Sequence, residues 1–89
     1  MTQMLIRHTV RDFAKWKPAY DAHRSARQAA GLKDLHLWRN VDNPNDVVLL
    51  FEVSDVSKAK AFAASPDLKQ AMTNAGVTGA PDIVLLSGD

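Results

Sequence analysis

The residues that decide the fold are Val47-Val48-Leu49-Leu50-Phe51-Glu52-Val53, a run of β-branched and aliphatic side chains that is typical of a strand. Alternate residues of a strand point to opposite faces of a sheet, so Leu49 and Phe51 share one face and Val48 and Leu50 share the other. Both faces are therefore apolar, and we expect both to be covered. Helices that pack on one face alone would leave the other in need of a partner.

The segment before this strand is rich in turn-forming residues. Asp42-Asn43-Pro44-Asn45-Asp46 favours a tight connection, because Pro suits the second position of a turn and Asn tolerates unusual backbone angles. It follows an alternating run at residues 35–41, so the two runs predict a β-hairpin. Further strands are expected at residues 4–10 and 83–86, with residues 77–81 as a loop.

The segment between the first two strands carries helix start and stop signals. Asp12 is placed to cap a helix that begins at Phe13, and Gly31 is placed to end it. Pro18 removes one backbone donor. We therefore expect either a short opening turn at residues 13–16 with the main helix from Pro18, or one kinked helix.

A second helical segment follows the hairpin. Asp55 is expected to cap a helix through residue 63, and Ser65-Pro66 to restart it until Gly76. The order of elements is then β-α-β-β-α-β, which predicts a ferredoxin-like α+β fold with a four-stranded antiparallel sheet. Because its helices cover one face, we expect a second copy to cover the other and to form a homodimeric α+β barrel.

Composition narrows the function classes. The 89 residues predict a single domain, residues 1–89, and the absence of cysteine excludes disulfides, thiolate metal sites and thiol nucleophiles. Eleven basic and ten acidic residues give a net charge of +1, which predicts no nucleic-acid partner and no membrane partner. No apolar run approaches a membrane span, and the first residues lack a signal-peptide core. We expect a cytoplasmic protein.

Three groups of residues carry a resemblance to a known superfamily. The first is Asp12-Phe13-x-x-Trp16 with Tyr20-Asp21-x-His23 and Gly31, and the second is Phe51-Glu52-Val53-x-Asp55. The third is the stretch 59–77, in which Ala, Phe and Leu recur at helical spacing. They resemble the dimeric α+β barrel superfamily, which includes antibiotic-biosynthesis-type monooxygenases, haem-degrading enzymes, small polyketide cyclases and stress-responsive barrel proteins. The haem-degrading members carry an Asn on the first strand and a His on the later helix. This chain has neither, which weighs against haem.

The first helix carries the main candidate cluster. At about 100° per residue, Trp16, Tyr20, His23 and Arg27 fall in one sector of roughly 60°, which Phe13 borders. One interpretation is an aromatic core edged by two polar groups. The other is a pocket in which aromatic walls hold a flat ligand, Arg27 pairs with a carboxylate or enolate oxygen, and His23 acts as general acid or base beside Tyr20.

Three further candidates lie on strands. His8 alternates with apolar residues, so it is either a hydrogen-bonded core residue or a member of the pocket. His36 and Trp38 share a face of the second strand, and an odd hairpin loop would bring them near Glu52. They either anchor the dimer interface or supply a His36–Glu52 acid–base pair. We include His8, His36 and Trp38 as candidate ligand contacts, together with Trp16 and Phe13 of the first helix.

No metal and no cofactor is expected, because the chain lacks zinc-binding histidine spacing, a phosphate loop and a nucleophile elbow. We predict that the protein forms a homodimer and binds a small aromatic or polyketide-like metabolite. The resemblance implies cofactor-independent monooxygenase activity, or cyclase or isomerase activity. The alternative is a non-enzymatic stress-responsive or interaction domain. A filled core beside Tyr20 would favour that alternative, whereas a cavity there would favour a ligand-binding protein.

Overall fold

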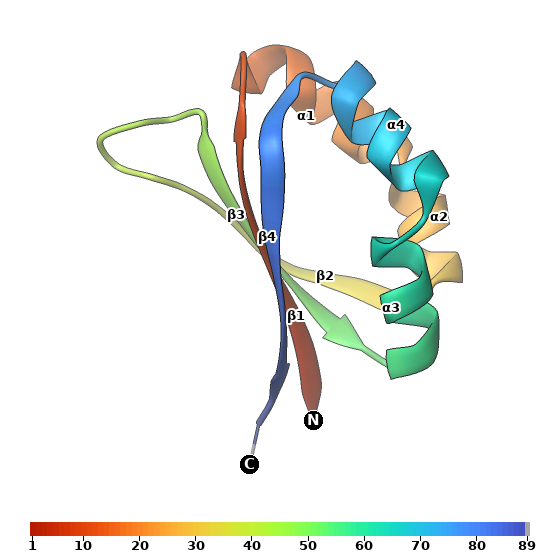
Figure 1. Ribbon diagram of the computed structural model, residues 1–89. Coiled ribbons are helices and arrows are strands. Elements are labelled where there is room, and N and C mark those ends of the chain that lie inside the picture. Colours follow the sequence, from red (N-terminus) through yellow and green to blue (C-terminus); the bar gives the residue numbers. More distant parts are fainter. Residues whose placement is uncertain (89) are drawn as a thin grey trace.

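The fold is built on one four-stranded antiparallel sheet with four helices on one of its faces (Figure 1). The structure is a computed structural model and describes residues 1–88. The strands lie in the order β2-β3-β1-β4. This confirms the ferredoxin-like β-α-β-β-α-β prediction. The elements are β1 (Thr2–Val10), α1 (Phe13–Ala22), α2 (Arg24–Ala29), β2 (Leu32–Arg39), β3 (Asp46–Val53), α3 (Val56–Ala63), α4 (Pro66–Asn74) and β4 (Val77–Ser87).

The helix boundaries follow the predicted caps. The Asp12 carboxylate accepts a hydrogen bond from the backbone N–H two residues later at 2.9 Å. Asp55 and Ser65 accept from the N–H three residues later at 3.1 Å and 3.3 Å. Gly31 and Gly76 follow the ends of α2 and α4 with positive φ of 77° and 92°, as a C-terminal helix stop requires.

The break in the first helical segment lies at His23, not at Pro18 as we predicted. α1 runs through Pro18, and α2 begins after His23. The carbonyl of Tyr20 explains this position, because it accepts the His23 N–H at 3.2 Å and Nη1 of Arg27 at 2.6 Å. The Arg27 side chain thus satisfies a carbonyl at the end of α1, and His23 comes to lie at the junction of the two helices.

Two strand boundaries also differ from the sequence prediction. β2 spans Leu32–Arg39 rather than residues 35–41, since it starts as soon as Gly31 ends the helix. β4 starts at Val77, so residues 77–81 belong to a strand and not to a loop. β4 lies at the edge of the sheet, where Pro81 need not donate to a neighbouring strand.

The pairing of β1 with β4 is irregular in the middle. Arg7 pairs with Asp82 and Thr9 with Thr78, so three residues of β4 lie opposite His8 alone. The bulge begins at Gly79, whose φ is 70°. Bulges bend an edge strand and are often found beside functional sites.

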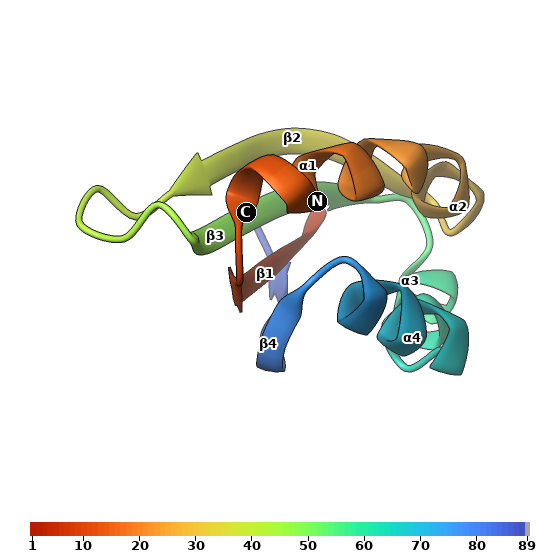
Figure 2. The same ribbon diagram turned by 90° about the horizontal axis from the view of Figure 1, so that it is seen from above.

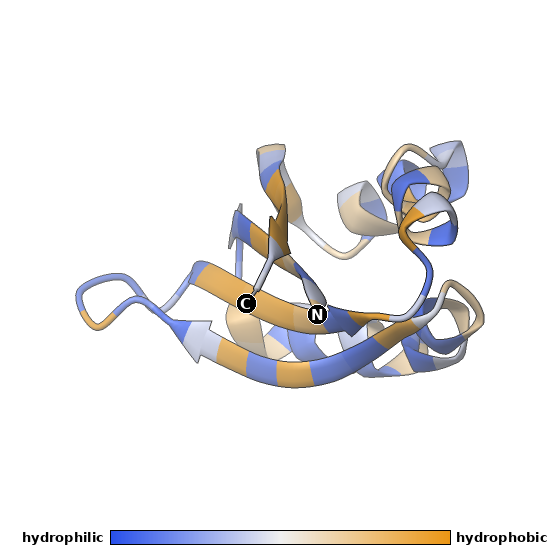
Figure 3. Cartoon of the chain, turned by 90° about the horizontal axis from the view of Figure 1, so that it is seen from below, coloured by the Kyte–Doolittle hydropathy of each residue, from blue (hydrophilic) through white to orange (hydrophobic). Residues whose placement is uncertain are grey.

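The two faces of the sheet differ in what covers them. The helix-side face holds the core, in which Met4, Val10, Val47 and Phe51 are almost completely buried. The pairings place Leu5, Leu50 and Val84 in one row of the other face, which no helix covers. Figure 3 shows this pattern as near-continuous hydrophobic colouring along β3 beside the alternating colouring of β2.

None of the helices formed by residues 1–88 has the length and hydrophobicity that crossing a bilayer would need.

Candidate functional site

A cavity of about 360 Å³ lies between the two pairs of helices, with the sheet as its floor. Figure 2 shows α1 and α2 on one side of this space and α3 and α4 on the other. The volume falls within the usual range of small-molecule sites, about 300–1,000 Å³. Its lining is mostly apolar and consists of Ile6, His8, Trp16, Ala19, Tyr20, Ala22, His23, Arg27, Leu32, Leu49, Phe51, Phe62, Leu68, Ala71, Met72, Asn74 and Ala75.

His8 reaches the cavity from the floor. Its side chain is 6% exposed, and neither ring nitrogen has a hydrogen-bond partner among residues 1–88. Burial lowers the pKa of His8 below its ordinary value of 6.5, and the nearby Asp46 opposes this only in part. The imidazole is therefore neutral near pH 7. A buried polar group without a partner destabilises the fold, and such groups are common where a ligand supplies the partner.

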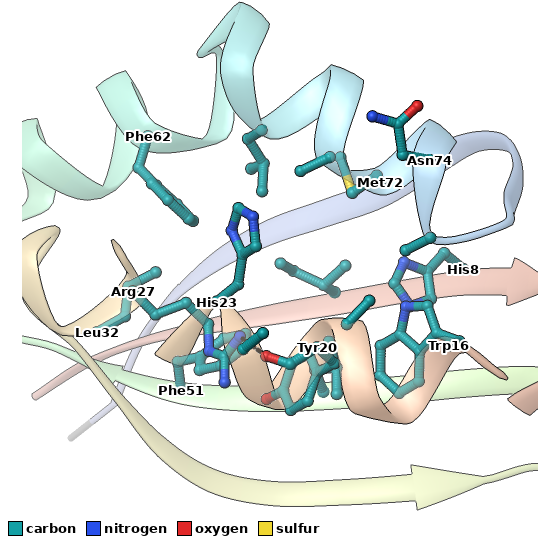
Figure 4. Close-up of a pocket in the computed structure, with 17 residues that line it drawn as sticks. His8, Trp16, Tyr20, His23, Arg27, Leu32, Phe51, Phe62, Met72 and Asn74 are labelled. Atoms are coloured by element: carbon teal, nitrogen blue, oxygen red, sulfur yellow. Dashed lines mark hydrogen bonds between the residues drawn. The ribbon is translucent and has the colours of Figure 1, made fainter. Parts of the chain in front are cut away.

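His23 reaches the same space from the junction of α1 and α2. In Figure 4 its ring points across the cavity, toward the helices of the opposite wall that carry Phe62 and Met72. Its Nδ1 is also buried without a partner among the described residues. The cavity thus receives unpaired imidazole nitrogens from two different elements.

An aromatic wall separates the two histidines along α1. Trp16 and Tyr20 are stacked, with ring centroids 4.7 Å apart and planes 24° apart. His8 meets Trp16 edge-on, with centroids 5.4 Å apart. Burial raises the pKa of Tyr20 to about 12, so its phenol is protonated at neutral pH. This wall suits a flat ring system, because aromatic faces stack on one another favourably.

Arg27 lies at the end of this wall and is only 5% exposed. Its Nε donates to Asp34 at 3.2 Å, and its guanidinium carbon lies 3.8 Å from the centroid of the Tyr20 ring. Asp34 thus already supplies a counter-charge to Arg27, and the guanidinium lies over the Tyr20 ring. The predicted contact between Arg27 and a ligand carboxylate stays a prediction, for which Asp34 is a competitor.

The opposite wall was missed by sequence reasoning. It consists of Phe62 from α3, four residues of α4, Leu68, Ala71, Met72 and Asn74, and Ala75 directly after that helix. No residue of α4 is buried, although the helix is amphipathic. Its apolar side covers the cavity instead of packing against the sheet. The spacing of Leu68, Met72 and Ala75 was the available signal, because it marks one side of a helix.

Three predicted ligand contacts lie outside the cavity. Phe13 packs behind Trp16, with ring centroids 5.6 Å apart. His36 and Trp38 stack on each other at 4.7 Å, and their pairing with Leu50 and Val48 puts them on the helix-free face of the sheet.

The alternative of a direct His36–Glu52 pair is not formed across the two strands. Lys33 lies opposite Glu52, on the far side of an irregularity between Asp34 and His36. His36 faces Leu50 instead. The described residues also contain no group of three or more His, Asp or Glu side chains arranged to hold a metal ion.

Comparison with solved structures matches this architecture over nearly the whole chain. A protein of Bordetella bronchiseptica, proposed to be an antibiotic biosynthesis monooxygenase, aligns with a TM-score of 0.78 over 99% of this chain and 96% of its own, at 16% identity. The fold is that of the antibiotic biosynthesis monooxygenases. The resemblance to the dimeric α+β barrel superfamily is thus confirmed for the fold.

Two further structures support the same monooxygenase fold. A protein of Caulobacter crescentus, also proposed to be an antibiotic biosynthesis monooxygenase, aligns with a TM-score of 0.73 at 16% identity, over 99% of this chain and 89% of its own. SnoaB of Streptomyces nogalater, a cofactor-independent oxygenase whose N63A mutant was solved, aligns with a TM-score of 0.69 at 21% identity, over 98% and 91%. Neither a protein-family model nor a curated protein sequence matches the chain. At these identities the likeness extends to the fold alone.

Proposed function

We propose that this chain binds a small, flat and largely apolar metabolite, of aromatic or polyketide-like type, in the cavity between its helix pairs. The observation that supports this most is the cavity itself, which pairs an apolar lining with unpartnered nitrogens on His8 and His23. An ordinary core would be filled and would leave no polar group unsatisfied. A bound ring system with polar substituents would satisfy both requirements.

The chemistry that fits these groups begins with proton transfer. His23 would take a proton from a carbon or hydroxyl next to a ring carbonyl, with Trp16 and Tyr20 holding the ring and Arg27 holding Tyr20. The resulting enolate can close a ring or move a double bond. Alternatively, it can reduce molecular oxygen, so that a ring methylene becomes a carbonyl and one water leaves. SnoaB, which shares the fold, is a cofactor-independent oxygenase, and this favours the oxygen-dependent route.

We further propose that the protein acts as a homodimer through the helix-free face of its sheet. Leu5, Val48 and Leu50 form the apolar centre of that face, and Val84 and Trp38 beside them remain exposed, Trp38 at 47%. A stable interface needs about 800 Å² from each partner, which is roughly one seventh of the 5646 Å² that the chain exposes.

The dimer is tested by Val84→Glu, which places a charge in this face. The matched control is Val56→Glu on α3, where Val56 is similarly exposed on the helix side. Sedimentation equilibrium should show a dimer for the parent chain and the control and a monomer for Val84→Glu. A monomeric parent chain, or a Val84→Glu variant that stays dimeric, would contradict this interface.

The interaction-domain alternative leaves the cavity unexplained. A protein whose aromatic residues served only dimerisation would gain stability by filling the space beside Tyr20. Here that space is open, and α4 lies over it without burying a side chain.

Native mass spectrometry of the purified protein tests ligand binding directly. We expect twice the 9.8 kDa chain mass plus an organic adduct that denaturation releases. Ala71→Phe, which fills the cavity from α4, should lose the adduct, whereas Gln70→Phe on the exposed side of the same helix should keep it. An adduct that survives Ala71→Phe would place the binding site elsewhere.

A further inference from the structure

The charge inside the cavity is carried by one residue. Among the lining side chains Arg27 is the only Lys, Arg, Asp or Glu. Burial lowers the pKa of His8 and raises that of Tyr20 to about 12, so both are uncharged near neutral pH. Arg27 is therefore the one permanently charged group of the lining, beside the titratable His23, and its attraction for an anion depends on whether its positive charge is available.

Asp34 makes that charge unavailable. It lies on β2, outside the set of residues that line the cavity, and its two oxygens lie 3.2 Å and 3.5 Å from Nε and Nη2 of Arg27. Nη1 of Arg27 donates to the Tyr20 carbonyl at 2.6 Å, and the guanidinium plane lies on the Tyr20 ring. Arg24 also approaches Asp34, at 3.6 Å, but it is 60% exposed and lines no part of the cavity.

We propose that Asp34 sets the charge class of the ligand: by neutralising Arg27, it makes the cavity accept neutral ring compounds and reject carboxylates of the same shape. This inference rests on the proposed binding of a flat ligand. A carboxylate in the cavity would lose its hydration without gaining a counter-charge, which costs far more than burying a neutral amide. The neutral ligand would instead meet the unpaired nitrogens of His8 and His23.

Asp34 is thus a positioning and specificity-determining residue, not a catalytic one. The substitution Asp34→Asn keeps an amide oxygen near Nε of Arg27 but removes the counter-charge. The guanidinium retains its hydrogen bond to the Tyr20 carbonyl and its stacking on the ring. The variant should therefore fold with Arg27 still in place and with its charge free to attract an anion.

The test uses two probes of the same shape, the neutral 2-naphthamide and the anionic 2-naphthoate, measured by isothermal titration calorimetry at neutral pH. We expect the parent protein to bind the amide at least about tenfold more tightly, so the effect of charge is judged from the change in this preference between variants and not from its absolute size. Asp34→Asn should reduce this preference by about tenfold, mainly by improving the affinity for 2-naphthoate. The control is Asp21→Asn, which makes the same change in net charge at an exposed residue paired with Lys17. It should leave the preference unchanged.

The possible results distinguish a failure of the proposed role of Asp34 from a failure of the proposed ligand binding. A parent protein that binds 2-naphthoate as tightly as 2-naphthamide, or an Asp34→Asn variant with an unchanged preference, overturns the role of Asp34 and leaves the binding of flat ligands standing. Equal shifts in Asp34→Asn and Asp21→Asn also overturn it, because they would show a general effect of net charge. Binding of neither probe overturns both the inference and the proposed function.

Discussion

Replacing His8 by leucine should make the protein more stable while weakening its ligand binding. His8→Leu exchanges the imidazole for a side chain of comparable size without polar atoms. The site is apolar apart from the imidazole, since neighbouring residues of the same strand face, Met4, Ile6 and Val10, are all buried. A residue retained for packing alone would show the opposite result, because its replacement would disturb the core.

The size of the effect follows from the burial of His8. The side chain is 6% exposed, and both nitrogens lack a partner among residues 1–88. A buried polar group left unsatisfied costs about 1–3 kcal/mol, so His8→Leu should raise the free energy of unfolding by about that amount. For a domain of this length, 1 kcal/mol corresponds to roughly 4–8 °C in Tm, so an increase of about 5 °C or more is expected.

The pH dependence of the free energy of unfolding provides a second test of the same residue. Because the pKa of His8 is lowered in the folded protein, the unfolded chain binds the extra proton first as pH falls below 6.5. The parent protein should therefore lose stability from pH 6.5 downward, toward the lowered folded pKa. His8→Leu should lack this part of the loss.

Urea denaturation at fixed protein concentration, followed by circular dichroism from pH 5 to 8, measures both effects. The control is Gln70→Leu, which changes an exposed polar residue on the helix side and should shift the free energy of unfolding by less than about 0.5 kcal/mol. A His8→Leu variant less stable than the parent, with the pH dependence unchanged, would refute our interpretation of His8 as an unsatisfied group.

Two further predictions concern residues around the cavity. Tyr20 is the only tyrosine in the chain, so ultraviolet absorbance should show its phenol ionising with a midpoint near pH 12. Because the unfolded chain loses this proton near pH 10, the folded protein should lose stability as pH rises from 10 toward 12. A midpoint near pH 10 would mean that the phenol is not buried. Gly31→Ala should destabilise the protein by about 2 kcal/mol and Gly79→Ala by about 1 kcal/mol, because both glycines have positive φ. Only at Gly31 would the new methyl also lie 2.5 Å from the Ser54 hydroxyl oxygen. Thermal unfolding should show this order, and equal losses of stability would contradict it.

Local signals in the sequence predicted most of the fold. Asp12, Asp55 and Ser65-Pro66 begin helices where their side chains can accept backbone N–H groups, and Gly31 ends one where the backbone turns left-handed. These are interactions within a few residues, so periodicity and cap chemistry were sufficient to identify them.

The boundaries that were wrong have two different causes. The break at His23 involves a hydrogen bond from the Arg27 side chain to the Tyr20 carbonyl, a local contact that helix periodicity and cap residues do not specify. The early start of β4 needs an edge position where Pro81 is tolerated, which depends on the neighbouring strand in the sheet.

The candidate site was likewise predicted only in part from the sequence. The helical spacing of Trp16, Tyr20, His23 and Arg27 predicted one wall correctly, because the members of one helix face must lie together. The wall from α4 was not predicted, since hydrophobic spacing cannot tell a helix that packs from a helix that covers a cavity. The partner of Arg27 was not predicted, because Asp34 lies on the next strand.

The most direct test of ligand binding in the cavity uses the fluorescence of Trp16. Trp38→Phe leaves Trp16 as the only tryptophan, and Trp16 lines the cavity. Titration with 1,4-naphthoquinone, a neutral flat molecule that this cysteine-free chain cannot trap through a thiol, should quench Trp16 saturably, and adding Ala71→Phe should abolish the saturable part. Quenching that rises linearly without saturation, or that is the same after Ala71→Phe, would contradict a ligand site between the helix pairs.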